Sequence, residues 1–183
     1  MRAVPASTDA TRALLPFAPS SDGPVRALVA SATRGGEGAL RFRYLLDADS
    51  SALRVPPARD AHQADELWKH TCFEAFIASR GDEYFELNFS PSTEWAAYSF
   101  TSYRKGMAPL ALPSPPRIDV TRSATQLVVE ARIDMRSFLA DTTHRIALSA
   151  VIEDDSGRIS YWALKHAPDK PDFHHAAGFI LEV

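Results

Sequence analysis

Polar and aromatic side chains that could contact a ligand gather in one stretch of the sequence, residues 67–100. The first half of this stretch carries Trp68, His70, Cys72 and Glu74, and the second half carries Tyr84, Glu86, Asn88 and Ser90. Carboxylate, amide and hydroxyl groups can hydrogen-bond a polar ligand, and an indole ring offers a flat apolar surface. The stretch therefore indicates a binding site, and the chain must contain elements that hold these side chains together.

Both halves of the stretch alternate between polar and apolar residues, which predicts two β-strands. Side chains that follow one another in a strand point to opposite faces of the sheet. The odd-numbered residues are mostly apolar, namely Phe73, Ala75 and Ile77 in the first run and Phe85, Leu87 and Phe89 in the second. We expect this odd-numbered set to face the core and the even-numbered polar set to form a site on the other face.

The segment between the two runs predicts a hairpin with a defined register. Residues 80–82 can form a three-residue loop, in which Gly81 is free to adopt a left-handed backbone conformation. A loop of odd length places odd-numbered residues opposite odd-numbered ones, so we expect Phe73 opposite Phe89 and Glu74 opposite Asn88. A shift by one residue would expose the apolar set, so the register should be firm.

The remaining sequence consists of short alternating runs separated by turns. We expect strands at residues 25–33, 40–46, 95–100, 118–120, 126–132, 146–152, 159–164 and 178–183. One short helix is expected at residues 133–139, with Asp134 as its N-cap. Many short strands and almost no helix favour an all-β fold, a two-sheet antiparallel β-sandwich of jelly-roll or immunoglobulin-like type with at most one short helix.

Composition sets the broad class of the protein. The 183 residues suit a single domain, of which residues 1–24 are expected to be a loosely ordered N-terminal arm with a short strand near residues 14–17. The net charge of −3 gives no reason to expect nucleic acid or an anionic membrane as a partner. One cysteine excludes an internal disulfide, and no leader or membrane-spanning run is visible, so we expect a cytoplasmic protein.

Four longer motifs resemble a known family. The runs LWKHTCFEAFI, YFELNFSPSTEWAAYSF, YRKGM and ISYWALKHAPDKPDFHHAAGF are similar to bacterial DOMON-like domain proteins, which are related to family 9 carbohydrate-binding modules. The resemblance extends from about residue 40 to the C-terminus. It implies a two-sheet β-sandwich with a concave face. Members of the wider superfamily bind sugars, bind haem as cytochrome domains, or have no assigned ligand.

The leading hypothesis for function is non-catalytic binding of a small polyhydroxylated ligand, with carbohydrate as the favoured class. In this hypothesis Trp68 and Trp162 supply stacking surfaces, while carboxylate, amide and guanidinium groups hydrogen-bond the hydroxyls. The candidate ligand-binding residues are Trp68, His70, Glu74, Glu86, Asn88, Trp95, Tyr98, Tyr103, Arg104, Trp162, Lys165 and His166. The alternative is that Glu74, Asn88 and Arg104 form a closed polar network without a ligand.

Haem binding and metal binding would depend on other sets of residues. A haem site would take its axial ligands from Met107, His166, His174 and His175, but a face that carries two Glu and an Asn suits haem poorly. The His-x-Cys-x-Glu pattern of residues 70–74 could place metal ligands, although it is a weak zinc signal.

The pair Glu74 and Glu86 could act as a general acid and base, but no nucleophile with an adjacent base accompanies them. We therefore expect no enzymatic activity, no metal and no cofactor. A haem-binding domain and a structural or interaction module, with a protein partner, remain the alternative functions.

Overall fold

Strands account for nearly all of the regular structure of the protein. The computed structural model describes residues 11–18, 23–35, 38–139 and 142–183. The strands are β1 (Arg12–Pro16), β2 (Val25–Arg34), β3 (Ala39–Ala48), β4 (Cys72–Ala78), β5 (Tyr84–Phe89), β6 (Trp95–Phe100), β7 (Ala108–Pro109), β8 (Arg117–Arg122), β9 (Gln126–Asp134), β10 (Arg145–Glu153), β11 (Ile159–Ala163) and β12 (Leu181–Glu182). Among the described residues, short 3-10 segments accompany them at η2 (Ser50–Ala52), η3 (Leu67–Lys69) and η4 (Ala176–Gly178). The prediction of an all-β fold is confirmed.

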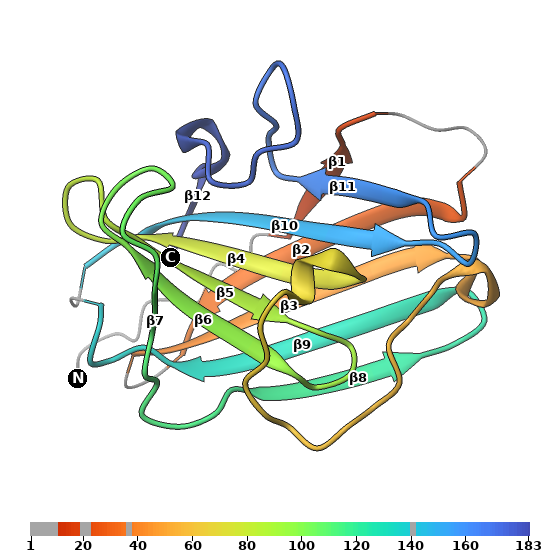
Figure 1. Ribbon diagram of the computed structural model, residues 1–183, viewed down its shortest axis with the longest axis horizontal. Coiled ribbons are helices and arrows are strands. Elements are labelled where there is room, and N and C mark those ends of the chain that lie inside the picture. Colours follow the sequence, from red (N-terminus) through yellow and green to blue (C-terminus); the bar gives the residue numbers. More distant parts are fainter. Residues whose placement is uncertain (1–10, 19–22, 36–37, 140–141) are drawn as a thin grey trace, which may run out of the picture.

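The strands form one continuous antiparallel sheet that curls on itself (Figure 1). Its order is β7-β6-β5-β4-β10-β11-β1-β2-β3-β9-β8, and β12 pairs with β10. β1 joins the two halves, because its first residues pair with β2 while Leu15 and Pro16 pair with β11. The expected division into two separate sheets is therefore not confirmed. Of the expected N-terminal arm, residues 1–10 and 19–22 lie outside the described residues, and the short strand expected within it corresponds to β1.

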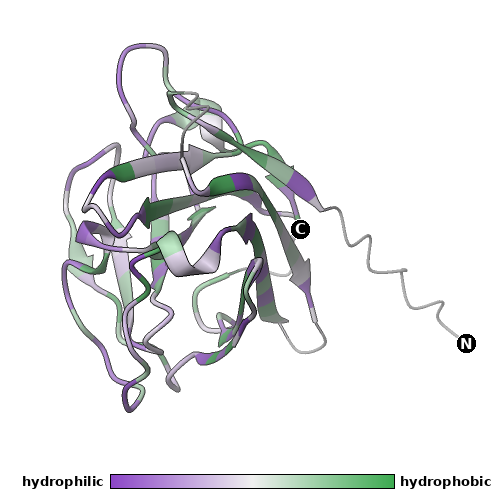
Figure 2. Cartoon of the chain, turned by 90° about the vertical axis from the view of Figure 1, so that its right-hand side faces the viewer, coloured by the Kyte–Doolittle hydropathy of each residue, from purple (hydrophilic) through white to green (hydrophobic). Residues whose placement is uncertain are grey.

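The main core lies between the two halves of the curled sheet. The Tyr44 hydroxyl of β3 donates a 2.7 Å hydrogen bond to the backbone carbonyl of Glu74 in β4. The rings of Phe42 and Phe89 are 5.7 Å apart, and those of Tyr44 and Phe73 are 5.0 Å apart. These contacts place β3 directly across the core from β4 and β5, while hydrophilic residues follow the long outer loops (Figure 2).

The predicted hairpin is present with the predicted register. Phe73 lies opposite Phe89 and Glu74 lies opposite Asn88, as the odd-length loop requires. Gly81 takes a φ of 58°, the left-handed conformation that a residue without a Cβ adopts at low cost. Phe73 and Phe89 are fully buried in the main core, so the even-numbered residues of β4 and β5 face the opposite side.

Two local predictions were wrong. The first strand of the hairpin begins at Cys72, and residues 67–69 form the 3-10 segment η3, entered through Glu66 with a φ of 62°. Residues 133–139 form no helix, because β9 keeps pairing with β3 as far as Asp134. The Asp134 carboxylate accepts the Arg136 N–H at 3.0 Å, as an N-cap would, but a turn follows. Within the described part of the chain, no helix is long and apolar enough to cross a membrane.

Candidate ligand-binding site

A cavity of about 370 Å³ lies on the face of β4, β5 and β10 that points away from the main core. Its wall is completed by η3, by the loop after β6 and by the chain segment between β11 and η4. The lining residues are Trp68, Glu74, Glu86, Phe100, Arg104, Met107, Val151, Tyr161, Pro171, Phe173 and His174. Strand alternation explains the floor, because Glu74 and Glu86 occupy even-numbered positions whose odd-numbered neighbours are buried in the core.

The covering segments are attached to the sheet by a second hydrophobic cluster. Its buried members include Phe76, Tyr84, Tyr98 and Phe100 on the outer face of the sheet, and Phe179 near the C-terminus packs against them. The four strand residues occupy even-numbered positions that would otherwise face water. Their burial therefore stabilises the segments that enclose the cavity.

η3 holds Trp68 at the edge of this cluster. The Trp68 ring packs edge-on against the Tyr98 ring, with 6.2 Å between the ring centroids. The Tyr98 hydroxyl in turn donates a 2.7 Å hydrogen bond to Asp65, just before η3. Trp68 is half-buried, so one part of its indole is packed while another part lines the cavity.

Asp172 fastens the C-terminal segment over the cavity. Its carboxylate accepts hydrogen bonds from the Arg104 guanidinium at 2.8 and 3.2 Å, from the Tyr103 hydroxyl, and from the His174 N–H at 3.2 Å. Burial alone would raise the pKa of Asp172, but the donors from Arg104 and Tyr103 hold this pKa below its ordinary value. The side chain is therefore a carboxylate at neutral pH, and it offsets the charge of Arg104.

His174 is a neutral imidazole whose orientation is set by Tyr84. The Arg104 backbone N–H donates to the Tyr84 oxygen at 3.2 Å, so the Tyr84 hydroxyl is free to donate to Nδ1 of His174, 2.8 Å away. Burial, followed by the nearby charge of Arg104, lowers the pKa of His174 to about 4. The remaining proton of the ring then lies on Nε2, which is 3.7 Å from Oε2 of Glu86.

Two buried carboxyl groups form the floor. Glu74 is 3% exposed and Glu86 is 5% exposed. Glu86 accepts a 2.8 Å hydrogen bond from the Asn88 amide, whereas Oε1 of Glu74 is buried without a hydrogen-bond partner among the described residues. Burial, and then the neighbouring Glu86, raises the pKa of Glu74 well above its ordinary value. Burial also raises the pKa of Glu86, although Asn88 and Arg104 oppose this effect.

The structure brings four of the predicted site residues to the cavity, namely Trp68, Glu74, Glu86 and Arg104. Three more support them from behind. Asn88 bonds Glu86, Tyr98 packs under Trp68, and Tyr103 bonds Asp172. Arg104 is bonded to Asp172, so the hypothetical closed network of Glu74, Asn88 and Arg104 does not form in this arrangement.

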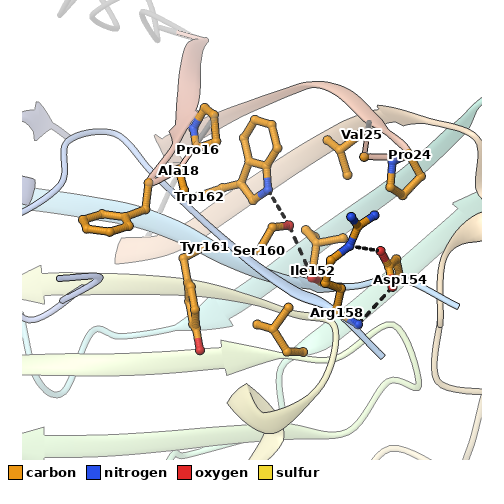
Figure 3. Close-up of a pocket in the computed structure, with 13 residues that line it drawn as sticks. Pro16, Ala18, Pro24, Val25, Ile152, Asp154, Arg158, Ser160, Tyr161 and Trp162 are labelled. Carbon is orange, nitrogen blue, oxygen red and sulfur yellow. Dashed lines mark hydrogen bonds and ion pairs between the residues drawn. The ribbon is translucent and has the colours of Figure 1, made fainter. Parts of the chain in front are cut away.

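Trp162 does not lie with Trp68. Figure 3 shows Tyr161 and Trp162 pointing in opposite directions from β11. Tyr161, 38% exposed, lines this cavity and also a second pocket of about 240 Å³ near Val25. Trp162 lines that second pocket and not the cavity, and its Nε1–H donates to Ser160 at 3.0 Å. The expectation that two tryptophans face one ligand is therefore wrong for this pair, because neighbouring strand residues alternate between faces.

Four other predicted residues lie away from the cavity. Trp95 is opposite Phe89 on the core side of β6 and is buried in the main core. His70 bonds the carboxylate of Glu153 at 2.7 Å. His166 bonds the carbonyl of Leu15 at 2.7 Å, and Lys165 is exposed outside the lining.

Several lining residues were not predicted as ligand contacts. The alternation within β6 and β11 is the signal that could have identified Phe100 and Tyr161, because both lie on the faces of these strands that point away from the main core. Phe173 and His174 lie in a segment without periodicity, and the sequence indicates His174 only as a candidate axial ligand of haem. Among the described residues, no group of three or more His, Cys, Asp or Glu side chains is arranged to hold a metal ion.

Comparison with known proteins shows a shared fold. No protein-family profile matches the sequence, and no curated protein matches it significantly. A protein of Bacteroides uniformis ATCC 8492, provisionally described as carbohydrate-binding, matches with a TM-score of 0.67 and 12% identity, over 93% of this chain and 84% of that chain. A family 9 carbohydrate-binding module from Caldicellulosiruptor kristjanssonii, in complex with cellotriose, matches with a TM-score of 0.50 and 11% identity, over 86% of this chain and 73% of that chain. The chain therefore has the same all-β architecture as these two carbohydrate-related proteins.

Proposed function

We propose that the protein binds a carbohydrate, without catalysis, in the cavity lined by Trp68, Glu74, Glu86 and Arg104. The observation that carries the proposal is the unpartnered, buried Oε1 of Glu74 in a cavity that also has aromatic walls. A buried polar atom without a partner costs free energy, and a ligand hydroxyl can satisfy it. The aromatic walls can pack against the apolar face of a sugar ring.

The fold neighbours support this proposal. Both are described in terms of carbohydrate binding, and one of them is in complex with cellotriose. Neither is described as an enzyme, which favours a binding role over hydrolysis by the two carboxyl groups. We further propose that the chain is a cytoplasmic, DOMON-like β-sandwich of bacterial type, in which the two halves of the curled sheet correspond to the two sheets of the sandwich.

Isothermal titration calorimetry with a panel of mono- and oligosaccharides tests the proposal. At least one sugar should bind the wild-type protein, and Trp68→Ala should abolish the heat of binding because it removes an aromatic wall. The melting temperature should change little, since Trp68 is only half-buried. Trp162→Phe is the matched control, because Trp162 lines the other pocket and should not affect titration of the same sugar.

A large loss of stability in Trp68→Ala would show that Trp68 is a core residue and not a binding surface. Failure of every sugar in the panel to bind would count against carbohydrate and favour an interaction module. The protein should bind no added haem and remain colourless once free haem is removed, because two buried carboxyl groups face the cavity. A Soret band of the purified protein would favour the cytochrome-like alternative instead.

A further inference from the structure

The acids that line the cavity outnumber the cations available to pair with them. The carboxyl, guanidinium and imidazole groups of the lining belong to Glu74, Glu86, Arg104 and His174. The guanidinium of Arg104 is paired with Asp172, and the imidazole of His174 is neutral at pH 7. Glu74 therefore has no compensating cation among the lining residues, and Glu86 is compensated only in part by Arg104, which is itself paired with Asp172.

Glu74 lacks the hydrogen bonds that a buried carboxyl group ordinarily has. Glu86 is held by the Asn88 amide, but Oε1 of Glu74 has no donor among the described residues. Ser149, directly opposite Glu74 on β10, also has a buried hydroxyl oxygen without a partner in the described part of the chain. The floor thus contains buried polar groups without hydrogen-bond partners, and Glu74 lines the cavity itself.

The walls favour a cation as well. Trp68, Phe100, Tyr161 and Phe173 surround the cavity with aromatic rings. The face of an aromatic ring carries partial negative charge and attracts an ammonium group, most strongly when the ring is tryptophan. The walls and the floor therefore favour positive charge in the same cavity.

We propose that the preferred ligand is an amino sugar with a free ammonium group, which hydrogen-bonds Glu74 and Glu86 on the floor of the cavity. This inference rests on the proposed function and specifies its ligand class. An ammonium group supplies three donors and no acceptor, and its charge favours the ionised form of a nearby carboxyl group, so it complements Glu74 and Glu86 better than a hydroxyl does. The same two acids disfavour uronic acids and phosphorylated sugars, because a further negative charge would be desolvated there without a cation to pair with it.

Paired titrations test the proposal. Calorimetry at a pH of about 6, where a sugar amine is protonated, would compare glucosamine, galactosamine and mannosamine each with its parent hexose and with glucuronate. A charge-assisted hydrogen bond predicts at least one amine that binds roughly tenfold or more tightly than its parent, and no binding of glucuronate. Equal or tighter binding of the parent hexoses would overturn the inference while leaving carbohydrate binding intact. If no sugar binds, both proposals fail.

Glu74→Gln distinguishes a contact with the ammonium group from a general effect of the fold. The substitution keeps the shape of the side chain and removes its ability to ionise beside the ammonium group, so the ratio of amine to parent affinity should fall toward one. Glu86→Gln provides the same readout if Glu74→Gln does not fold. An unchanged ratio in a folded variant of either residue would refute a role for that carboxyl group.

Proton release supplies an independent readout. Glu74 faces Glu86 across the strand pair and the Cys72 thiol on its own strand, and Tyr44 donates to its backbone from the core side. Because burial and Glu86 raise the pKa of Glu74, binding of an ammonium group should expel its proton into the solvent. The binding enthalpy of the amine should therefore vary with the ionisation enthalpy of the buffer, while that of the parent hexose should not. A buffer-independent enthalpy for the amine would contradict a contact with protonated Glu74.

Discussion

Replacing Asp172 by asparagine removes the charge that fastens the C-terminal segment over the cavity. The wild-type carboxylate, only 4% exposed, accepts two hydrogen bonds from Arg104, one from the Tyr103 hydroxyl and one from the His174 backbone. Asparagine has nearly the same volume and keeps one acceptor oxygen. The substitution therefore tests the ion pair and its charged hydrogen bonds without creating a cavity.

The magnitude follows from these contacts. A hydrogen bond to a charged group contributes about 1.5–3 kcal/mol and a neutral one about 0.5–1.5 kcal/mol. The Arg104 side chain is 47% exposed, so water screens part of the ion pair. We expect a loss of about 2 kcal/mol in the free energy of unfolding, which lowers the melting temperature of a chain of this size by roughly 4–8 °C.

Thermal unfolding monitored by circular dichroism measures this loss, with Asp169→Asn as the control. Asp169 is an exposed carboxylate in the same segment, so its substitution should leave the melting temperature within about 1 °C of wild type. The pKa of Asp172 is held below its ordinary value of 3.8, so its contribution to stability is present above pH 3.8 and is lost as the pH falls through the folded-state pKa. Equal melting temperatures of the two variants at pH 7 would refute the role of Asp172 as the fastening group.

Three further measurements probe the two faces of the hairpin. Burial and Glu86 raise the pKa of Glu74, so its contribution to stability is present below the ordinary pKa of 4.5 and is lost as the pH rises. Glu74→Gln should therefore gain stability relative to wild type as the pH rises above 4.5, and a difference in melting temperature that does not change with pH would contradict this. The Cys72 thiol is buried, and burial is the main cause that raises its pKa. A thiol reagent should therefore modify Cys72 only after denaturant unfolds the chain, and rapid labelling of the native protein would contradict this. Phe89 is fully buried, so Phe89→Ala should lower the free energy of unfolding in urea by about 3–5 kcal/mol. Leu15→Ala, at a side chain that is 56% exposed, should lower it by less than about 1 kcal/mol. Similar losses in the two variants would mean that the core side of the hairpin is wrongly assigned.

Local sequence pattern was sufficient to predict the central hairpin. The alternation in residues 72–78 and 84–89, together with an odd-length loop around Gly81, led to the register that places Phe73 opposite Phe89. This succeeds because the period of a strand is two, so a slip would reverse the faces of every residue. The same alternation correctly placed Glu74 and Glu86 on the face that became the cavity floor.

Pattern failed where a segment has no period of its own. The alternation predicts that Trp68 continues the strand, yet it lies in a 3-10 segment whose position depends on Tyr98 and Asp65. Phe173 lies in a segment rich in proline and histidine, and only its packing against distant strands brings it to the cavity. No local signal in either segment indicates where it folds over the sheet.

By itself, then, the sequence determined an all-β chain, the register of its central hairpin and the side on which its carboxyl groups lie. The tertiary structure decided which groups meet there. Arg104 bonds Asp172 across 68 positions of the chain, and Trp162 faces away from Trp68 because Tyr161 occupies the position that points to the cavity. The physical reason is that alternation acts within a strand, whereas the enclosure of a site depends on burial and on hydrogen bonds between segments far apart in sequence.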